Sequence, residues 1–118
     1  MNEEEKREMM MDFERSRQML GGLSQQKQQM SIQVEVIKAS LEELKETKEK
    51  TVMKIIGNIL VSKSVADMSK ELKEQQETFE LRLKTIDKQE ETLIKKLNSI
   101  KSKIEGKSEE EDKKTKKK

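Results

Sequence analysis

The feature that most constrains this chain is a short segment at its centre, residues 51–63 (TVMKIIGNILVSK), where helical periodicity stops. The segment is the richest part of the chain in β-branched residues, which lose side-chain freedom in helices and suit strands. Gly57-Asn58 divides it into two runs, and such a pair suits a two-residue type II′ turn. The segment therefore predicts a β-hairpin, although one continuous helix that tolerates Gly57 remains the alternative.

A two-stranded hairpin is marginally stable in water, and its edges and faces need partners. The apolar residues here do not alternate cleanly, which is typical of strands that are covered on both faces. We therefore expect the hairpin to be an oligomerisation element that pairs with other chains. Its candidate contact residues are Val52, Met53, Ile55, Ile56, Gly57, Ile59, Leu60 and Val61.

Two heptad-patterned segments flank the hairpin. From Met9, steps of four and three reach eleven positions up to Leu44, and nine of them are apolar. From Val65, the same steps reach twelve positions up to Ile104, again with nine apolar. These seams span about 36 and 40 residues, on the order of 55–60 Å of helix each. The fold class is therefore mainly α, a long antiparallel two-helix coiled coil with one central β-hairpin that joins an oligomeric β platform.

The expected boundaries are a helix over 1–50, the hairpin over 51–63, a helix over 64–105 and a charged, disordered tail over 106–118. Ser64 followed by Asp67 resembles a capping box at the start of the second helix. Gly106 suits the position just after its end. The Gly21-Gly22 pair costs roughly 1 kcal/mol per residue relative to Ala, so it marks a weak point in the first helix.

Composition excludes several classes of protein. Charged residues make up 42% of the chain and apolar residues 31%, too few to bury a compact single core. The chain has no Cys and no His, and its carboxylates fall on solvated helix faces, so we expect no catalytic residues, no metal site and no cofactor. The acidic start is not a signal peptide, and no apolar run is long enough to span a membrane, so a cytoplasmic location is expected.

The residues resemble those of a known family. The run VMKIIGNILV, the following ELKEQQETFELRLKTIDKQEETLIKKLNSIKSKI and the upstream QQKQQMSIQ are similar to a prefoldin β-class subunit of the archaeal type. One hairpin between the helices separates this class from the α class, which carries two. The motif's aromatic position is Met53 here or is missing, and the methionine cluster and Lys-rich tail are not signatures of the family.

The resemblance implies a hexamer in which two α-class subunits join four β-class subunits, including further copies of this chain. It also implies that their hairpins join in an oligomeric β-barrel platform. It also implies an ATP-independent holdase that captures non-native polypeptides and passes them to a group II chaperonin.

An antiparallel arm with the hairpin at its base brings the two ends of the chain together at the far tip. Apolar and largely unbranched side chains gather there, and methionine adapts to irregular surfaces. We expect this tip to hold clients; the alternative is that several of its residues serve only as seam residues. The candidate client-binding residues are Met9, Met10, Met11, Phe13, Met19, Leu20, Leu97, Ile100 and Ile104.

Two other functions fit parts of the sequence. A structural or tethering coiled coil would have a central helix and no chaperone activity. A nucleic-acid-binding accessory would depend on the Lys-rich tail, but the near-balanced net charge of +2 does not favour nucleic acid. We interpret the tail as a solubilising segment, with a salt-sensitive contact to an acidic chaperonin rim as the alternative.

Overall fold

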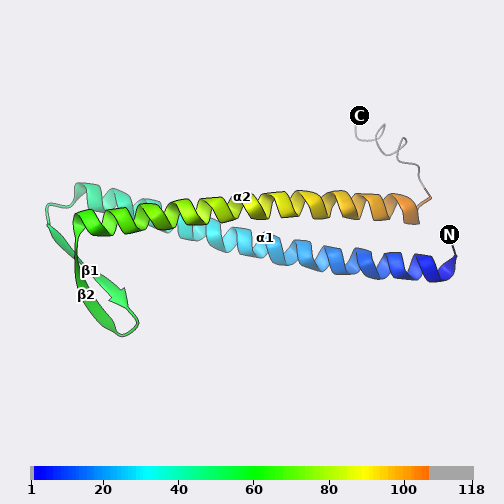
Figure 1. Cartoon of the computed structure of the whole chain (residues 1–118), viewed down its shortest axis with the longest axis horizontal. Coiled ribbons are helices and arrows are strands. Elements are labelled where there is room, and N and C mark those ends of the chain that lie inside the picture. The colour runs from blue at the N-terminus through cyan, green and yellow to red at the C-terminus, as the bar shows by residue number, and fades with distance from the viewer. Residues whose placement is uncertain (1, 107–118) are drawn as a thin grey trace, which may run out of the picture. The chain divides into compact units, whose positions relative to one another are not determined.

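The computed structural model describes residues 2–106 and contains two long helices joined by a β-hairpin (Figure 1). The order is α1 (Glu3–Glu46), β1 (Thr51–Ile56), β2 (Ile59–Ser64) and α2 (Val65–Ile104). The mainly helical fold class and the central hairpin are confirmed, and the alternative of one continuous helix is wrong. The tail expected over 106–118 lies outside the described residues, apart from Gly106.

The chain divides into two compact units. One combines α1 up to Lys27 with α2 from Thr85 onward, and the other spans Gln28–Lys84 and includes the hairpin. In the first unit, α1 and α2 run antiparallel, because Asp12 pairs with Lys96 while Lys27 pairs with Asp87. The heptad pattern is what brings these helices together.

The predicted seam is the apolar centre of both units. All eleven seam positions of α1 and all twelve of α2 are buried or half-buried. Val34, Ile37, Ile86 and Ile100 are the buried apolar residues of the described chain. Ser16 also occupies a seam position and is only 1% exposed. The seam therefore keeps its phase through Gly21-Gly22, as the spacing predicts.

The helix ends are fixed by local hydrogen bonds. The side chain of Asn2 accepts a 2.7 Å bond from the Glu5 amide, and Ser64 Oγ accepts a 3.0 Å bond from the Asp67 amide. At the far end of α2, Gly106 has a φ of 74° and its amide donates to the carbonyl of Lys103 at 3.3 Å. This left-handed position after the last turn is one that glycine adopts without strain.

The first helix ends earlier than the expected boundary at residue 50. It stops at Glu46, and the Glu49 amide then donates to Thr47 Oγ1 at 3.2 Å, which satisfies a backbone group outside the helix. The Val65 amide donates to the Lys50 carbonyl at 2.9 Å and closes the base of the hairpin. Residues 47–50 therefore belong to the connection, and Ser64 is both the last strand residue and the cap of α2.

The hairpin has an antiparallel register from Thr51 opposite Ser64 to Ile56 opposite Ile59. Gly57 has a φ of 57°, and no residue other than glycine has a positive φ in the described chain. A type I′ turn would need a positive φ at Asn58 as well, so the backbone agrees with the type II′ turn expected from the sequence.

Replacing Ser64 with Ala should lower the free energy of unfolding by about 1 kcal/mol, because the Asp67 amide would lose its capping partner. Chemical denaturation followed by circular dichroism measures the change. Ser62→Ala is the matched control, since Ser62 is exposed on the same strand, and it should change stability by less than about 0.5 kcal/mol. Equal effects of the two substitutions would show that the cap does not stabilise α2.

Candidate functional site

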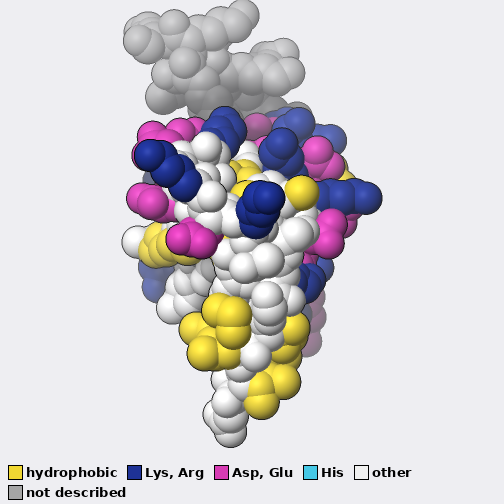
Figure 2. Space-filling model, turned by 90° about the vertical axis from the view of Figure 1, so that its left-hand side faces the viewer, with side chains coloured by type: hydrophobic (Ala, Val, Ile, Leu, Met, Phe, Trp, Pro, Cys, Tyr) yellow, Lys and Arg dark blue, Asp and Glu magenta, His cyan; other side chains and the backbone are white. Residues whose placement is uncertain are grey.

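The hairpin has two unlike faces. Because side chains alternate along a strand, Met53, Ile55 and Leu60 share one face, which we call the outer face. Their side chains are 58%, 74% and 61% exposed. Apolar side chains gather on the hairpin in the lower part of Figure 2. A large exposed apolar surface of this kind marks a protein–protein contact.

The opposite face of the hairpin is partly covered by the chain itself. Val52 and Val61 are half-buried on this inner face, and Lys54 and Lys63 lie on it beside them. The chain itself therefore supplies part of the cover over Val52 and Val61, and contact of these two residues with other chains stays a prediction. Near the turn, Ile56 and Ile59 share the inner face but remain exposed. The most exposed apolar surface of the hairpin is therefore the outer face together with these two residues.

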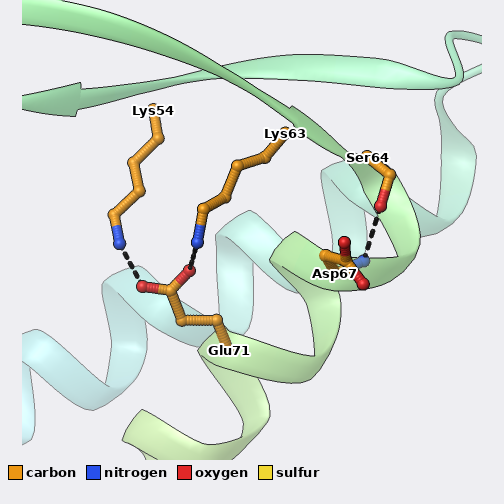
Figure 3. Close-up of polar contacts among 5 residues, drawn as sticks. All are labelled: Lys54, Lys63, Ser64, Asp67 and Glu71. Atoms are coloured by element: carbon orange, nitrogen blue, oxygen red, sulfur yellow. Dashed lines mark hydrogen bonds and ion pairs between the residues drawn. The ribbon is translucent and has the colours of Figure 1, made fainter.

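A single carboxylate holds both strands to α2. Glu71 lies in the second turn of α2; one of its oxygens accepts a hydrogen bond from Lys54 on β1, and the other accepts one from Lys63 on β2 at 2.6 Å (Figure 3). The hydrogen bonds from Lys54 and then Lys63 lower the pKa of Glu71 below its ordinary value of 4.5. The sequence did not predict this bridge, because three charged residues on three elements meet only once the hairpin folds towards the helix.

The ends of the helices form a hollow in the first unit. Its volume is about 420 Å³, and it is lined by Met10 and Phe13 from α1 and Ile104 from α2, together with Glu14, Lys101 and Glu105. Nearby, Lys96 Nζ lies 3.2 Å from an Asp12 carboxylate oxygen and joins the two helices. The antiparallel arrangement therefore brings three of the candidate client-binding residues together, two from one end of the described chain and one from the other.

The remaining candidate client-binding residues occupy other positions. Met11 and Met19 are more than half exposed, but neither lines the hollow at the helix ends. Ile100 is only 7% exposed, because it packs in the seam, and so it offers no client surface in this structure. The other three candidates lie half-buried at seam positions: Met9, Leu20 and Leu97.

A polar junction interrupts the apolar seam of the first unit. Lys27 Nζ lies 2.6 Å from Asp87 and 3.2 Å from Glu90, and Ser24 Oγ donates to Glu90 at 2.7 Å. The hydrogen bonds to Asp87 and then Glu90 raise the pKa of Lys27 above its ordinary value of 10.5. Lys27 and Glu90 are both polar exceptions in the heptad pattern. Their opposite charges at seam positions were a signal that they face each other, and sequence reasoning missed it.

The pKa shifts of Lys27 and Glu71 arise from ion pairs between structural elements, not from burial in a pocket. Within residues 2–106, no group of three or more acidic side chains is arranged to hold a metal ion. Neither helix of that part of the chain is long and apolar enough to cross a membrane.

Comparison with known proteins places the chain among relatives of one kind. A family model described as prefoldin subunit matches residues 7–111. The chain is 36% identical to the prefoldin subunit beta of Thermococcus onnurineus over 98 residues, which cover 82% of this chain and 84% of that protein. It is also 36% identical to the prefoldin subunit beta of Archaeoglobus fulgidus over 90 residues, 75% of this chain and 78% of the relative.

A solved structure has the same fold. The crystal structure of the prefoldin beta subunit from Thermococcus strain KS-1 superposes with a TM-score of 0.78 at 29% sequence identity. The match covers 86% of this chain and 90% of that one. Its agreement with two helices around a single hairpin confirms the β-class resemblance that the sequence motifs indicate.

The Glu71 bridge makes stability depend on pH in a defined direction. Its folded-state pKa is lowered, so its contribution is complete above the ordinary carboxyl pKa and is lost as the pH falls through the lowered value. Thermal unfolding midpoints should therefore fall further on acidification for the wild type than for Glu71→Gln. Glu77→Gln, an exposed carboxylate in the same helix, should behave as the wild type. Parallel curves for all three proteins would contradict the role of the bridge.

Proposed function

The chain belongs to the prefoldin family of chaperone subunits, and from this we propose that it acts as an ATP-independent holdase. In this proposal it captures non-native polypeptides and passes them to a group II chaperonin. The observation that carries the proposal is the pair of apolar surfaces on one chain, the outer face of the hairpin and the hollow at the helix ends. The first suits permanent assembly, and the second suits transient binding.

The outer face and the free strand edges serve assembly in this proposal. Prefoldin β subunits assemble with α subunits into a hexamer, and we propose two α-class partners with four copies of the β class. Each strand edge gains backbone hydrogen bonds when it pairs with a neighbouring hairpin, and the exposed Ile55 and Leu60 become covered in the resulting β-barrel platform. The Glu71 bridge supports this role because it holds both strands against α2 before a partner arrives.

The helix ends serve client capture. Met10 lines the hollow with Phe13 and Ile104, and Met10 and its neighbour Met11 are both exposed, so the end of the helix pair offers unbranched and adaptable apolar side chains. Several such ends in one hexamer would hold a client more tightly than any one of them alone, because the second contact becomes intramolecular. Binding of this kind needs neither nucleotide nor chemistry, so we propose a cytoplasmic chaperone that is not an enzyme.

Assembly should fail when a charge is placed on the outer face. Ile55→Glu would have to bury an unpaired carboxylate in the platform, and its mixture with an α-class subunit should lack the hexamer peak in multi-angle light scattering. Val36→Glu is the matched control, because Val36 is an exposed apolar residue of α1, and it should assemble normally. A wild-type chain that stays an elongated dimer with the partner would contradict the proposed function itself.

Client capture should weaken when the exposed methionines at the helix end become polar. The double substitution Met10→Ser and Met11→Ser in an assembled hexamer should raise the concentration needed to suppress client aggregation by at least about threefold. Light scattering of a chemically denatured client on dilution measures this. The control double substitution Ile32→Ser and Val36→Ser removes two equally exposed apolar side chains elsewhere on α1. Equal loss in both variants would show that the helix end is not the capture surface.

A further inference from the structure

A second apolar groove lies further along the helix pair, within the first unit. Its volume is about 580 Å³, which falls within the range of protein ligand sites. It shares no lining residue with the hollow at the helix ends. Its walls include Met19, Gly22, Leu23 and Gln26 from α1, with Lys88 and Leu93 from α2.

Gly22 keeps this groove open. Gly21 and Gly22 lie in the middle of a 44-residue helix, where glycine is unfavourable, and their φ values are not positive. A Cβ atom added at either position would meet nothing within 4 Å. Neither backbone conformation nor close packing therefore requires glycine here. What Gly22 does provide is space, because it lines the groove and Gly21 does not.

The walls of the groove carry little charge for so charged a chain. Between Glu14 and Glu35, α1 contains no acidic residue, and its only charged residues are Arg15, Arg17 and Lys27. Arg17 pairs with Glu14, and Lys27 is held by Asp87 and Glu90. Lys88 is the one charged residue among those that line the groove. An apolar ligand could thus be buried here with little desolvation of charged groups, and the remaining field favours a neutral or acidic one.

We propose that the groove over Gly22 is a second polypeptide-binding surface, which takes apolar side chains from an extended, neutral or acidic segment of a non-native protein. The inference rests on the proposed chaperone function and adds a site to it. Met19 borders the groove and is more than half exposed, so it can adapt to side chains of different shape. The amides of Gln26 and Gln89 can both donate to and accept from the backbone of an extended chain.

The two glycines supply a matched pair of variants. Gly22→Leu would place a side chain in the groove, whereas Gly21→Leu makes the same chemical change one residue away without filling it. Both substitutions favour the helix, so loss of folding does not explain a difference between them. The full chain, assembled with an α-class prefoldin subunit, is titrated against a fluorescent peptide of alternating Leu and Glu, and binding is followed by anisotropy. Alternation places the leucines on one side of an extended peptide.

The Gly22→Leu complex should bind this peptide about tenfold more weakly than the wild type, as expected when one large apolar side chain of the peptide is excluded. Gly21→Leu should bind as the wild type does. The wild-type complex should bind the peptide of alternating Leu and Glu more tightly than one of alternating Leu and Lys, because Lys88 is cationic. Lys88→Glu should reverse this preference. Equal affinities of the two leucine variants would overturn the proposal. A change in oligomeric mass caused only by Gly22→Leu would also overturn it, because the groove would then contact another copy of this chain.

These measurements distinguish a failure of the groove proposal from a failure of the proposed chaperone function. If the wild-type complex suppresses client aggregation and the two leucine variants bind the peptide equally, the groove proposal alone fails. If the wild-type complex neither suppresses aggregation nor binds the peptide, both proposals fail. Peptide binding that is lost in Gly22→Leu but kept in the Met10→Ser and Met11→Ser variant supports a groove that acts independently of the helix end.

Discussion

The apolar seam between α1 and α2 is the interaction on which the other features of this chain depend. Nearly a third of the residues are apolar, and the two helices bury or half-bury those that lie on a stripe two positions wide per heptad. A stripe of this width cannot also cover the hairpin or the grooves beside it. Met10 and Met19, which lie outside the stripe, and Ile55 and Leu60 on the hairpin therefore remain exposed.

The Glu71 bridge connects this helical framework to the hairpin. A free hairpin would bring disordered strands to each assembly contact, and ordering them would oppose association. One carboxylate that binds Lys54 and Lys63 fixes both strands relative to the start of α2, and Ser64 caps that helix directly after β2. The cap that starts α2 and the carboxylate that orients both strands therefore lie only seven residues apart, at Ser64 and Glu71. Because the bridge is ionic and partly exposed, its strength depends on pH and on salt.

Local patterns made most of the fold predictable. Heptad spacing, β-branched residues around Gly57-Asn58 and the Ser64 cap each depend on residues close in sequence, and all agree with the structure. The end of α1 was placed four residues too late, because the charged stretch there contains no glycine or proline to mark the boundary, and the hydroxyl of Thr47 accepts a hydrogen bond from the Glu49 amide only after the helix has ended. The Glu71 bridge and the meeting of Lys27 with Glu90 depend on how elements far apart in sequence align, which periodicity alone does not give.

The candidate binding surfaces were harder to predict because exposure depends on which flank of the seam a residue occupies. Ile100 and Met10 are both apolar residues near a helix end, yet one is buried in the seam and the other is exposed. The groove over Gly22 is still harder to predict from the sequence, because it is open only where glycine has no side chain to fill it. A glycine pair in mid-helix lowers helix stability, and the structure shows open space where a larger residue would fit. Glycine at this position lowers helix stability and leaves an open apolar surface, which is consistent with the polypeptide-binding role proposed for the groove.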